Sequence, residues 1–220
     1  MRFVLARLLV LLPPLMLAGC VATYPSLSSL EAHYNSFKVP PPSGRTIHVC
    51  HAYGCQMQTQ FRFNDDDIKH LGAILAKWRT KAATAEEERR GIAYSIGWMK
   101  ERVGKVIGTI ADRAGDDFEG NGDPTQEDCV DEANNTTSFL TVMANTGLLK
   151  HHKVGIPFAK EDYSRGMAGW THWTAVLIEQ PSGQRWAVDS WIFACCENPA
   201  VVKAEEWYVA GIDNLAKPTQ

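Results

Sequence analysis

Two short β-patterns open the folded part of the chain. The stretch 56–63, QMQTQFRF, alternates along its length and is rich in β-forming residues. The stretch 46–50, TIHVC, has the same character. We expect both to form strands, on either side of a loop between Cys50 and Cys55.

Two helical patterns follow. Asn64 is a favourable N-cap, and the acids at 65–67 suit the positive end of a helix dipole. Thr84 and Glu87 form a capping box for a second helix, which we expect to run to about Gly108. In both segments apolar residues recur at helical spacing and predict a core face: Ile68, Leu71, Leu75 and Trp78 in the first, and Ile92, Ile96, Met99, Val103 and Val106 in the second.

A third helix and a hairpin complete the pattern. Thr125 is a suitable N-cap with Asp128 as its third-residue acid, and the helix runs to Gly147. Its apolar face is formed by Val130, Ala133, Thr137, Leu140 and Ala144. The strands 171–179 and 185–193 flank the turn sequence PSG and pair as a hairpin. The expected fold class is α+β, with helices packed on a small antiparallel sheet.

The first 20 residues carry an export signal. Arg2 and Arg7 precede a largely apolar run, which ends in the small residues of LAGC at 17–20. This ending resembles the bacterial lipobox, which implies a signal peptide over 1–19 and a Cys20 that is acylated with fatty acids such as palmitate. Val21 then favours an outer-membrane lipoprotein that faces the periplasm. The alternative is an ordinary cleaved signal with a chance cysteine.

Composition divides the rest of the chain into two parts. The segment 20–45 is rich in Ser and Pro, and we expect a flexible, partly extended tether. Residues 46–220 are enough for one domain with its own core. The net charge of −3 and the lack of a basic patch argue against a nucleic-acid partner.

No cofactor or metal site is expected. His48, Cys50, His51 and Cys55 include metal-ligand types, but they lack the paired spacing of a structural zinc site. The pair His151-His152 raises the same question without a better pattern, and a CxxCH haem motif is absent.

Whether the cysteines form disulfides depends on the compartment of the protein. Exported proteins meet oxidising conditions, and five cysteines remain after Cys20, so at least one stays outside a disulfide. Cys50 and Cys55 are close enough for a local bridge. Cys195 and Cys196 are adjacent and could form a vicinal pair, stay reduced or reach the Cys50 region. Cys129 has no nearby partner.

Cys129 lies among four acids in QEDCVDEAN at 126–134. A helix N-terminus favours a thiolate, which opposes the effect of these carboxylates. We expect Asp128 and Asp131 to leave the helix on other faces and to point into water. A nucleophilic thiol also needs a base, and the hairpin can offer one, with His172 at the open end of one strand and Asp189 late in the other.

A helix-borne cysteine, then HxxxV on one strand and VDSW on the next, resembles the transglutaminase-like fold, a relative of the papain-like cysteine hydrolases. The match covers about 120–193 and looks closest to the bacterial transglutaminase-like cysteine peptidases, and also to an uncharacterised family of proteobacterial lipoproteins. The resemblance implies that Cys129 is the nucleophile, His172 the general base and Asp189 the orienting acid. It further implies an oxyanion hole formed by the Cys129 N–H and by Gln126. Trp170 and Trp173 flank His172 and are candidate walls of a substrate cleft.

The sequence therefore predicts a lipid-anchored envelope enzyme. It is expected to be a cysteine peptidase, amidase or acyltransferase that acts on peptide or peptidoglycan-type amides through a thioester, with the membrane as a partner through Cys20. Two alternatives remain. One is a non-catalytic envelope binding module on the same fold, and the other is a redox protein that works through Cys195-Cys196 or Cys50-Cys55.

Overall fold

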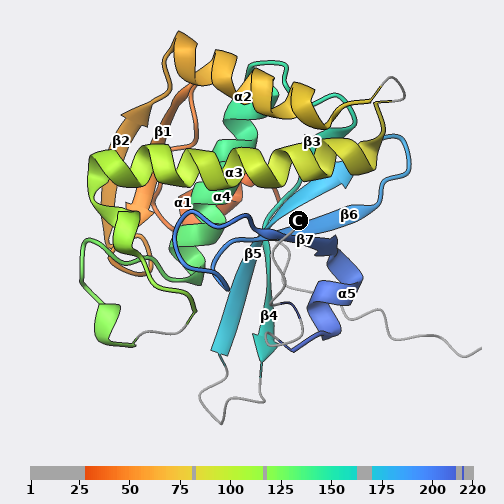
Figure 1. The fold of residues 1–220 in the computed structure, drawn as a ribbon. Helices are drawn as coiled ribbons and strands as arrows, with labels where there is room; N and C mark the ends of the chain where they lie inside the picture. The colour runs from red at the N-terminus through yellow and green to blue at the C-terminus, as the bar shows by residue number, and fades with distance from the viewer. Residues whose placement is uncertain (1–27, 81–82, 116–117, 163–169, 212–214, 216–220) are drawn as a thin grey trace, which may run out of the picture.

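The computed structural model describes residues 28–80, 83–115, 118–162, 170–211 and 215 (Figure 1). The described chain is α+β, with five α-helices, a two-stranded sheet and a five-stranded sheet, both antiparallel. In chain order the elements are α1 (Leu30–Ser36), β1 (Thr46–His51), β2 (Met57–Arg62), α2 (Asp65–Trp78), α3 (Ala85–Ile107), the 3-10 turns η1 (Thr109–Ala111) and η2 (Phe118–Gly120), α4 (Cys129–Asn145), β3 (His152–Val154), β4 (Phe158–Asp162), β5 (Trp170–Glu179), β6 (Arg185–Asp189), β7 (Ala200–Lys203) and α5 (Ala204–Val209).

The larger sheet is organised around its longest strand, β5. The strand order is β3-β5-β6-β7, and β4 also pairs with β5. The carboxyl half of β5 pairs with β3 through Leu177 and Val154, whereas its amino half pairs with β4 through Thr174 and Phe158. β6 pairs with β5 only as far as Ala175 and Val188. The amino end of β5 therefore extends past the end of this ladder, and His172 lies in that extension.

α4 is the central helix, and it is buried along almost its whole length. It packs against β5 and β1, while α2 and α3 run side by side over it (Figure 1). This arrangement forms one main apolar cluster from both sheets and three helices. Its buried members include Val49, Phe63, Leu71, Leu75, Ile92, Ile96, Met99, Phe139, Leu140, Leu177 and Val188.

The predicted helix starts are confirmed in two of three cases. Asn64 forms a capping box with Asp67, and Thr84 forms one with Glu87. The prediction for the third helix was wrong, because its N-cap is Asp128 rather than Thr125, so that Cys129 is the first helical residue. The Asp128 carboxylate reaches two backbone N–H groups of the first turn, while Thr125 bonds to Asp123 in the preceding loop.

Other expectations need correction. Val106 is 60% exposed, because it lies on the outer face of α3, whereas Val103 and Gly104 of the same turns are buried and Ile107 packs against the core. Ala144 at the end of α4 is also exposed. The second hairpin strand ends at Asp189 rather than at Phe193. The strands β3, β4 and β7 and the helix α5 were not predicted, since they are short and lack a clear period.

The segment expected to be a tether contains α1. Ser29 caps this helix, and the Tyr34 hydroxyl lies 3.1 Å from Ser138 on α4. Tyr34 and Val39 are both buried. From Leu30 onward this part of the chain therefore packs against the domain, because it carries apolar side chains among its prolines and serines. The signal segment and Cys20 lie outside the described residues.

None of the helices in the described ranges is long and apolar enough to cross a membrane.

Candidate active site

Cys129 is the first residue of α4, and its side chain is nearly enclosed. Asp128 precedes it as the N-cap and accepts hydrogen bonds from the N–H groups of Val130 and Asp131, at 3.1 and 2.9 Å. Cys129 is 4% exposed, and its Sγ donates to the Thr171 carbonyl at 3.5 Å. The thiol therefore lies against β5, one residue before His172.

His172 and Asp189 are joined by a buried hydrogen bond between Nε2 and Oδ2, at 2.7 Å. The ladder that pairs Ala175 with Val188 places Asp189 opposite Thr174 if it is continued by one position. His172 is two residues further along β5 and projects from the same face as Thr174, since side chains alternate along a strand. The pair is thus a diagonal neighbour pair across the hairpin. His172 is 0% and Asp189 1% exposed.

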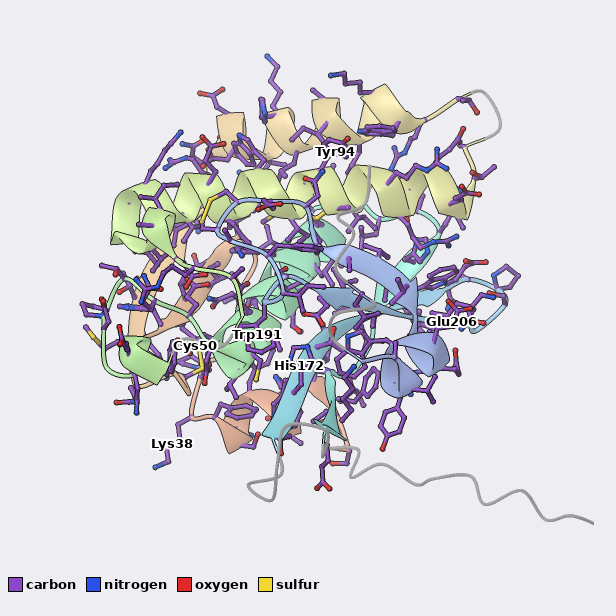
Figure 2. All side chains as sticks on the ribbon, turned by 60° about the horizontal axis from the view of Figure 1, so that its bottom comes forward. Lys38, Cys50, Tyr94, His172, Trp191 and Glu206 are labelled. Atoms are coloured by element: carbon purple, nitrogen blue, oxygen red, sulfur yellow. A yellow bond between two sulfur atoms is a disulfide. The ribbon has the colours of Figure 1, made fainter. Side chains whose placement is uncertain are left out.

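Two tryptophans enclose the His172 ring. Trp191 lies at 4.6 Å between ring centroids, and Trp207 of α5 lies at 5.2 Å. Figure 2 shows His172 on β5 with Trp191 close beside it. Cys129 belongs to the same buried cluster as both tryptophans. The cysteine therefore lies close to the enclosure that holds the His172–Asp189 pair, and its sulfur makes no hydrogen bond to His172 Nδ1 in the described structure.

The free nitrogen of the imidazole defines what the pair can do. His172 Nδ1 is buried and has no hydrogen-bond partner among the described residues. When Nε2–H donates to the Asp189 carboxylate, Nδ1 carries the lone pair and is the acceptor. A carboxylate that fixes the tautomer in this way leaves the imidazole able to take a proton from a nucleophile.

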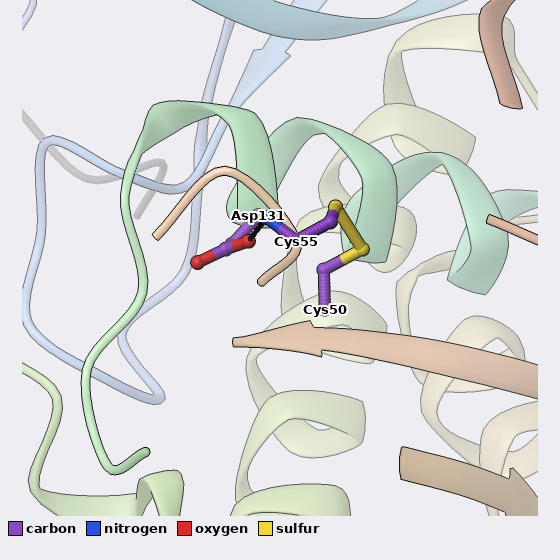
Figure 3. Close-up of side chains that lie close together, drawn as sticks. All are labelled: Cys50, Cys55 and Asp131. Carbon is purple, nitrogen blue, oxygen red and sulfur yellow. Dashed lines mark hydrogen bonds between the residues drawn. A yellow bond between two sulfur atoms is a disulfide. The ribbon is translucent and has the colours of Figure 1, made fainter. Parts of the chain in front are cut away.

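Asp131 does not point into water, as the sequence had led us to expect. It is buried, and one carboxylate oxygen accepts the backbone N–H of Cys55 at 2.6 Å (Figure 3). The other oxygen accepts the backbone N–H of Tyr53 at 2.8 Å. Burial, together with the charge of Asp128, raises the pKa of Asp131 well above its ordinary value. Burial also raises the pKa of Asp128, which is half-buried. These shifts reduce the negative charge that the two acids hold beside Cys129 at a given pH.

The other two acids of QEDCVDEAN belong to a separate buried cluster. Oxygens of Glu127, Glu132 and Asp112 lie within 4.8 Å of one another, and Lys100 of α3 donates to Glu132. Burial, and then the charge of Glu132, raises the pKa of Asp112 to about 7 and that of Glu127 well above its ordinary value. Three carboxylates could in principle hold a cation, but the ammonium of Lys100 already supplies the positive charge here.

Gln126 lies in the loop before α4. Its Nε2 donates to the Ala111 carbonyl at 3.3 Å and to Thr125, while its Oε1 accepts from the Arg113 N–H at 3.2 Å. These bonds connect the loop to the segment after α3. The structure thus gives the Gln126 amide local partners, and an oxyanion contact would require it to change them.

Trp170 and Trp173 flank His172 in the sequence. Trp173 projects from the opposite face of β5 and packs against His33 and Phe37 of the α1 region, at ring distances of 5.5 and 5.3 Å. Trp173 therefore anchors α1, and it also packs against the buried cluster that contains Cys129. The Trp170 backbone pairs with Asp162, and its side chain lies outside the described residues.

Both remaining cysteine pairs form disulfides, Cys50 with Cys55 and Cys195 with Cys196. Among the described residues Cys129 is the cysteine that takes no part in a disulfide. The Cys50 and Cys55 sulfurs lie near Asp131 (Figure 3), but disulfide sulfurs are not available as thiolate ligands. His51 instead bonds to the Pro124 carbonyl and to Thr59.

Sequence reasoning missed Trp207. Its indole Nε1–H donates to Asp189 Oδ2 at 2.7 Å. No local signal in the sequence relates a tryptophan at 207 to an aspartate at 189, because α5 reaches this site only through the folding of β7 back along β6.

Comparisons of the chain with protein-family models, with curated proteins and with solved structures found no match.

Proposed function

We propose that this protein is a cysteine hydrolase or acyltransferase with Cys129 as nucleophile, His172 as general base and Asp189 as orienting acid. The observation that carries the proposal is the buried bond from His172 Nε2 to Asp189. His172 Nδ1 has no partner among the residues that the structure describes, and the Cys129 sulfur contacts the carbonyl of Thr171, the residue directly before His172. A nucleophile, a base and a group that orients the base are the parts that covalent acyl transfer requires.

The chemistry follows from these roles. Nδ1 of His172 takes the Cys129 proton, and the thiolate attacks an amide or ester carbonyl carbon. The tetrahedral intermediate collapses to a thioester, and imidazolium protonates the leaving amine or alcohol. Water then releases the acid in a hydrolase, or an amine forms a new amide in an acyltransferase.

The start of α4 can stabilise the negative charge of the tetrahedral intermediate. Its N-terminus presents backbone N–H groups and the positive end of the helix dipole. Asp128 accepts the N–H groups of Val130 and Asp131, so the Cys129 N–H is the donor we assign to the developing oxyanion.

The resemblance to transglutaminase-like cysteine peptidases favours the same assignment. It rests on Cys129, on HxxxV from His172 and on VDSW around Asp189. The lipobox-like sequence LAGC also suggests a cellular location. We propose that the protein is anchored to the bacterial envelope by lipid at Cys20 and faces the periplasm. Amides of peptides and of peptidoglycan stems are the substrates within reach there.

The test is turnover of envelope peptides and peptidoglycan fragments by the wild type and by Cys129→Ala. We expect the wild type to release or transfer an acyl group, and the variant to keep its fold and lose all activity. Trapping of a thioester on the Cys129 peptide, detected by mass spectrometry, would support the assignment directly. Undiminished turnover by the variant would refute it.

A second candidate is a non-catalytic envelope binding module on the same fold. The observation that favours it is burial, because Cys129 and His172 are 4% and 0% exposed and a substrate could reach them only after local opening. A binding module needs no reactive thiol, so an inert Cys129 would decide for this alternative.

A further inference from the structure

The hydrogen bond from Trp207 to Asp189 adds a residue to the proposed site. Trp207 Nε1 and His172 Nε2 both lie 2.7 Å from the same oxygen, Oδ2 of Asp189. The other oxygen, Oδ1, is buried and has no hydrogen-bond partner among the described residues. Oδ2 therefore accepts both of the hydrogen bonds that the structure gives this carboxylate.

The chemistry of the two donors fixes the direction of both hydrogen bonds to Asp189 Oδ2. An indole N–H can only donate, so Asp189 is the acceptor in its bond with Trp207. The same oxygen then accepts Nε2–H from His172, which leaves the lone pair on Nδ1. A buried carboxylate with few partners loses much of its orientation when one donor is removed.

α5 is fixed in place by a buried lysine. Lys160 Nζ donates to the backbone carbonyls of Trp207 at 2.9 Å and Ala210 at 2.8 Å, and it lies 4.3 Å from the centroid of the Trp207 ring. Lys160 is paired with His172 in the register of β4 and β5. Phe158, on the same face of β4, packs edge-on against Trp207. These contacts hold the indole at one angle over the site.

We propose that Trp207 is a positioning residue, whose N–H fixes the Asp189 carboxylate and through it the tautomer and orientation of His172. A role of Trp207 in catalysis rests on the proposed function. The Trp207–Asp189–His172 geometry itself can be tested independently of turnover.

The test compares Trp207→Phe with Trp186→Phe in the full-length chain. Both variants keep an aromatic ring and remove one buried indole N–H. Trp186 is a matched control, because its Nε1 has no hydrogen-bond partner among the described residues and it lies on the opposite face of the sheet, beside Arg89. Two quantities are measured: the pH dependence of Cys129 alkylation by iodoacetamide, and the imidazole ¹⁵N shifts of His172.

We expect Trp207→Phe to slow Cys129 alkylation at neutral pH about tenfold, to move the pH profile upward, and to shift His172 away from a pure Nε2–H tautomer. Trp186→Phe should leave both readouts unchanged, even if it lowers the melting temperature as much. An unchanged ¹⁵N pattern in Trp207→Phe would overturn the positioning role.

The outcomes separate the inference from the proposed function. If His172→Ala abolishes the reactivity of Cys129 and Trp207→Phe does not alter it, the positioning role is wrong and the proposed function stands. If wild-type Cys129 is inert but the ¹⁵N pattern of His172 responds to Trp207→Phe, the positioning stands and the proposed catalytic use fails.

Discussion

The Cys129 thiol donates to the carbonyl of Thr171 at 3.5 Å, and so the sulfur lies against the strand position directly before His172. The contact joins the start of α4 to the amino end of β5, and the two residues are 42 positions apart in the chain. It places the thiol at the edge of the enclosure that contains the His172 imidazole and the Asp189 carboxylate. The account of function depends on this juxtaposition.

Asp189→Asn tests the orienting role of the carboxylate. The amide has the same size but can present an N–H to His172, which favours the tautomer with its proton on Nδ1. We expect the alkylation rate of Cys129 at pH 7 to fall at least about tenfold, a lower bound suggested by the larger losses seen when a triad carboxylate is replaced. Asp66→Asn, at an exposed position on α2, is the control. Equal rates in the two variants would argue that Asp189 is merely structural.

Lys100→Met tests the acid cluster beneath α4. The change removes the buried cation that pairs with Glu132 in the cluster of three carboxylates Asp112, Glu127 and Glu132. Loss of one partner from a buried pair costs about 3–5 kcal/mol, so the free energy of unfolding at pH 7 should fall by about that amount in urea titrations. Lys105→Met removes an exposed pair with Glu101 and should change it by no more than about 0.5 kcal/mol. Similar values for both variants would contradict the account.

Asp112→Asn tests the pH dependence of the same cluster. Burial and the charge of Glu132 raise the pKa of Asp112 to about 7 in the folded protein, whereas an unfolded aspartate titrates near about 3.9. Between about pH 4 and 7 the folded state therefore binds more protons than the unfolded state, and stability falls as the pH rises.

One such proton gives a slope of at most about 1.4 kcal/mol per pH unit. The asparagine cannot ionise, so we expect a flatter curve over this window, with part of the slope left because the pKa of Glu127 is also raised. Unfolding free energies measured from pH 4 to 8 would show it. A slope unchanged from the wild type would mean that Asp112 does not titrate in this range.

Local sequence patterns predicted the parts of the fold that local chemistry determines. The caps at Asn64 and Thr84 and the alternation before Phe63 each act over a few residues, and the corresponding elements are present. The predicted start of α4 was three residues too early, because Thr125 is also a suitable N-cap and only the contacts of the loop, in which Thr125 bonds to Asp123, decide for Asp128.

Long-range contacts explain the rest. Asp131 is an exposed first-turn acid by its pattern, but the loop between Cys50 and Cys55 covers it and uses it as an acceptor. α1 lies in a segment rich in Ser and Pro, yet Tyr34 reaches Ser138 across more than a hundred residues. Trp207 approaches Asp189 only after β7 has paired with β6. None of these relations has a short-range signature in the sequence.

The most direct test of the central claim is the pH dependence of Cys129 alkylation by iodoacetamide, in the wild type and in His172→Ala. The account predicts that the wild-type rate rises with a midpoint well below the value of about 8.5 of an ordinary thiol, and that this low midpoint is lost in the variant. An inert thiol, or the same ordinary midpoint in both proteins, would contradict the account and favour a structural cysteine in a binding module.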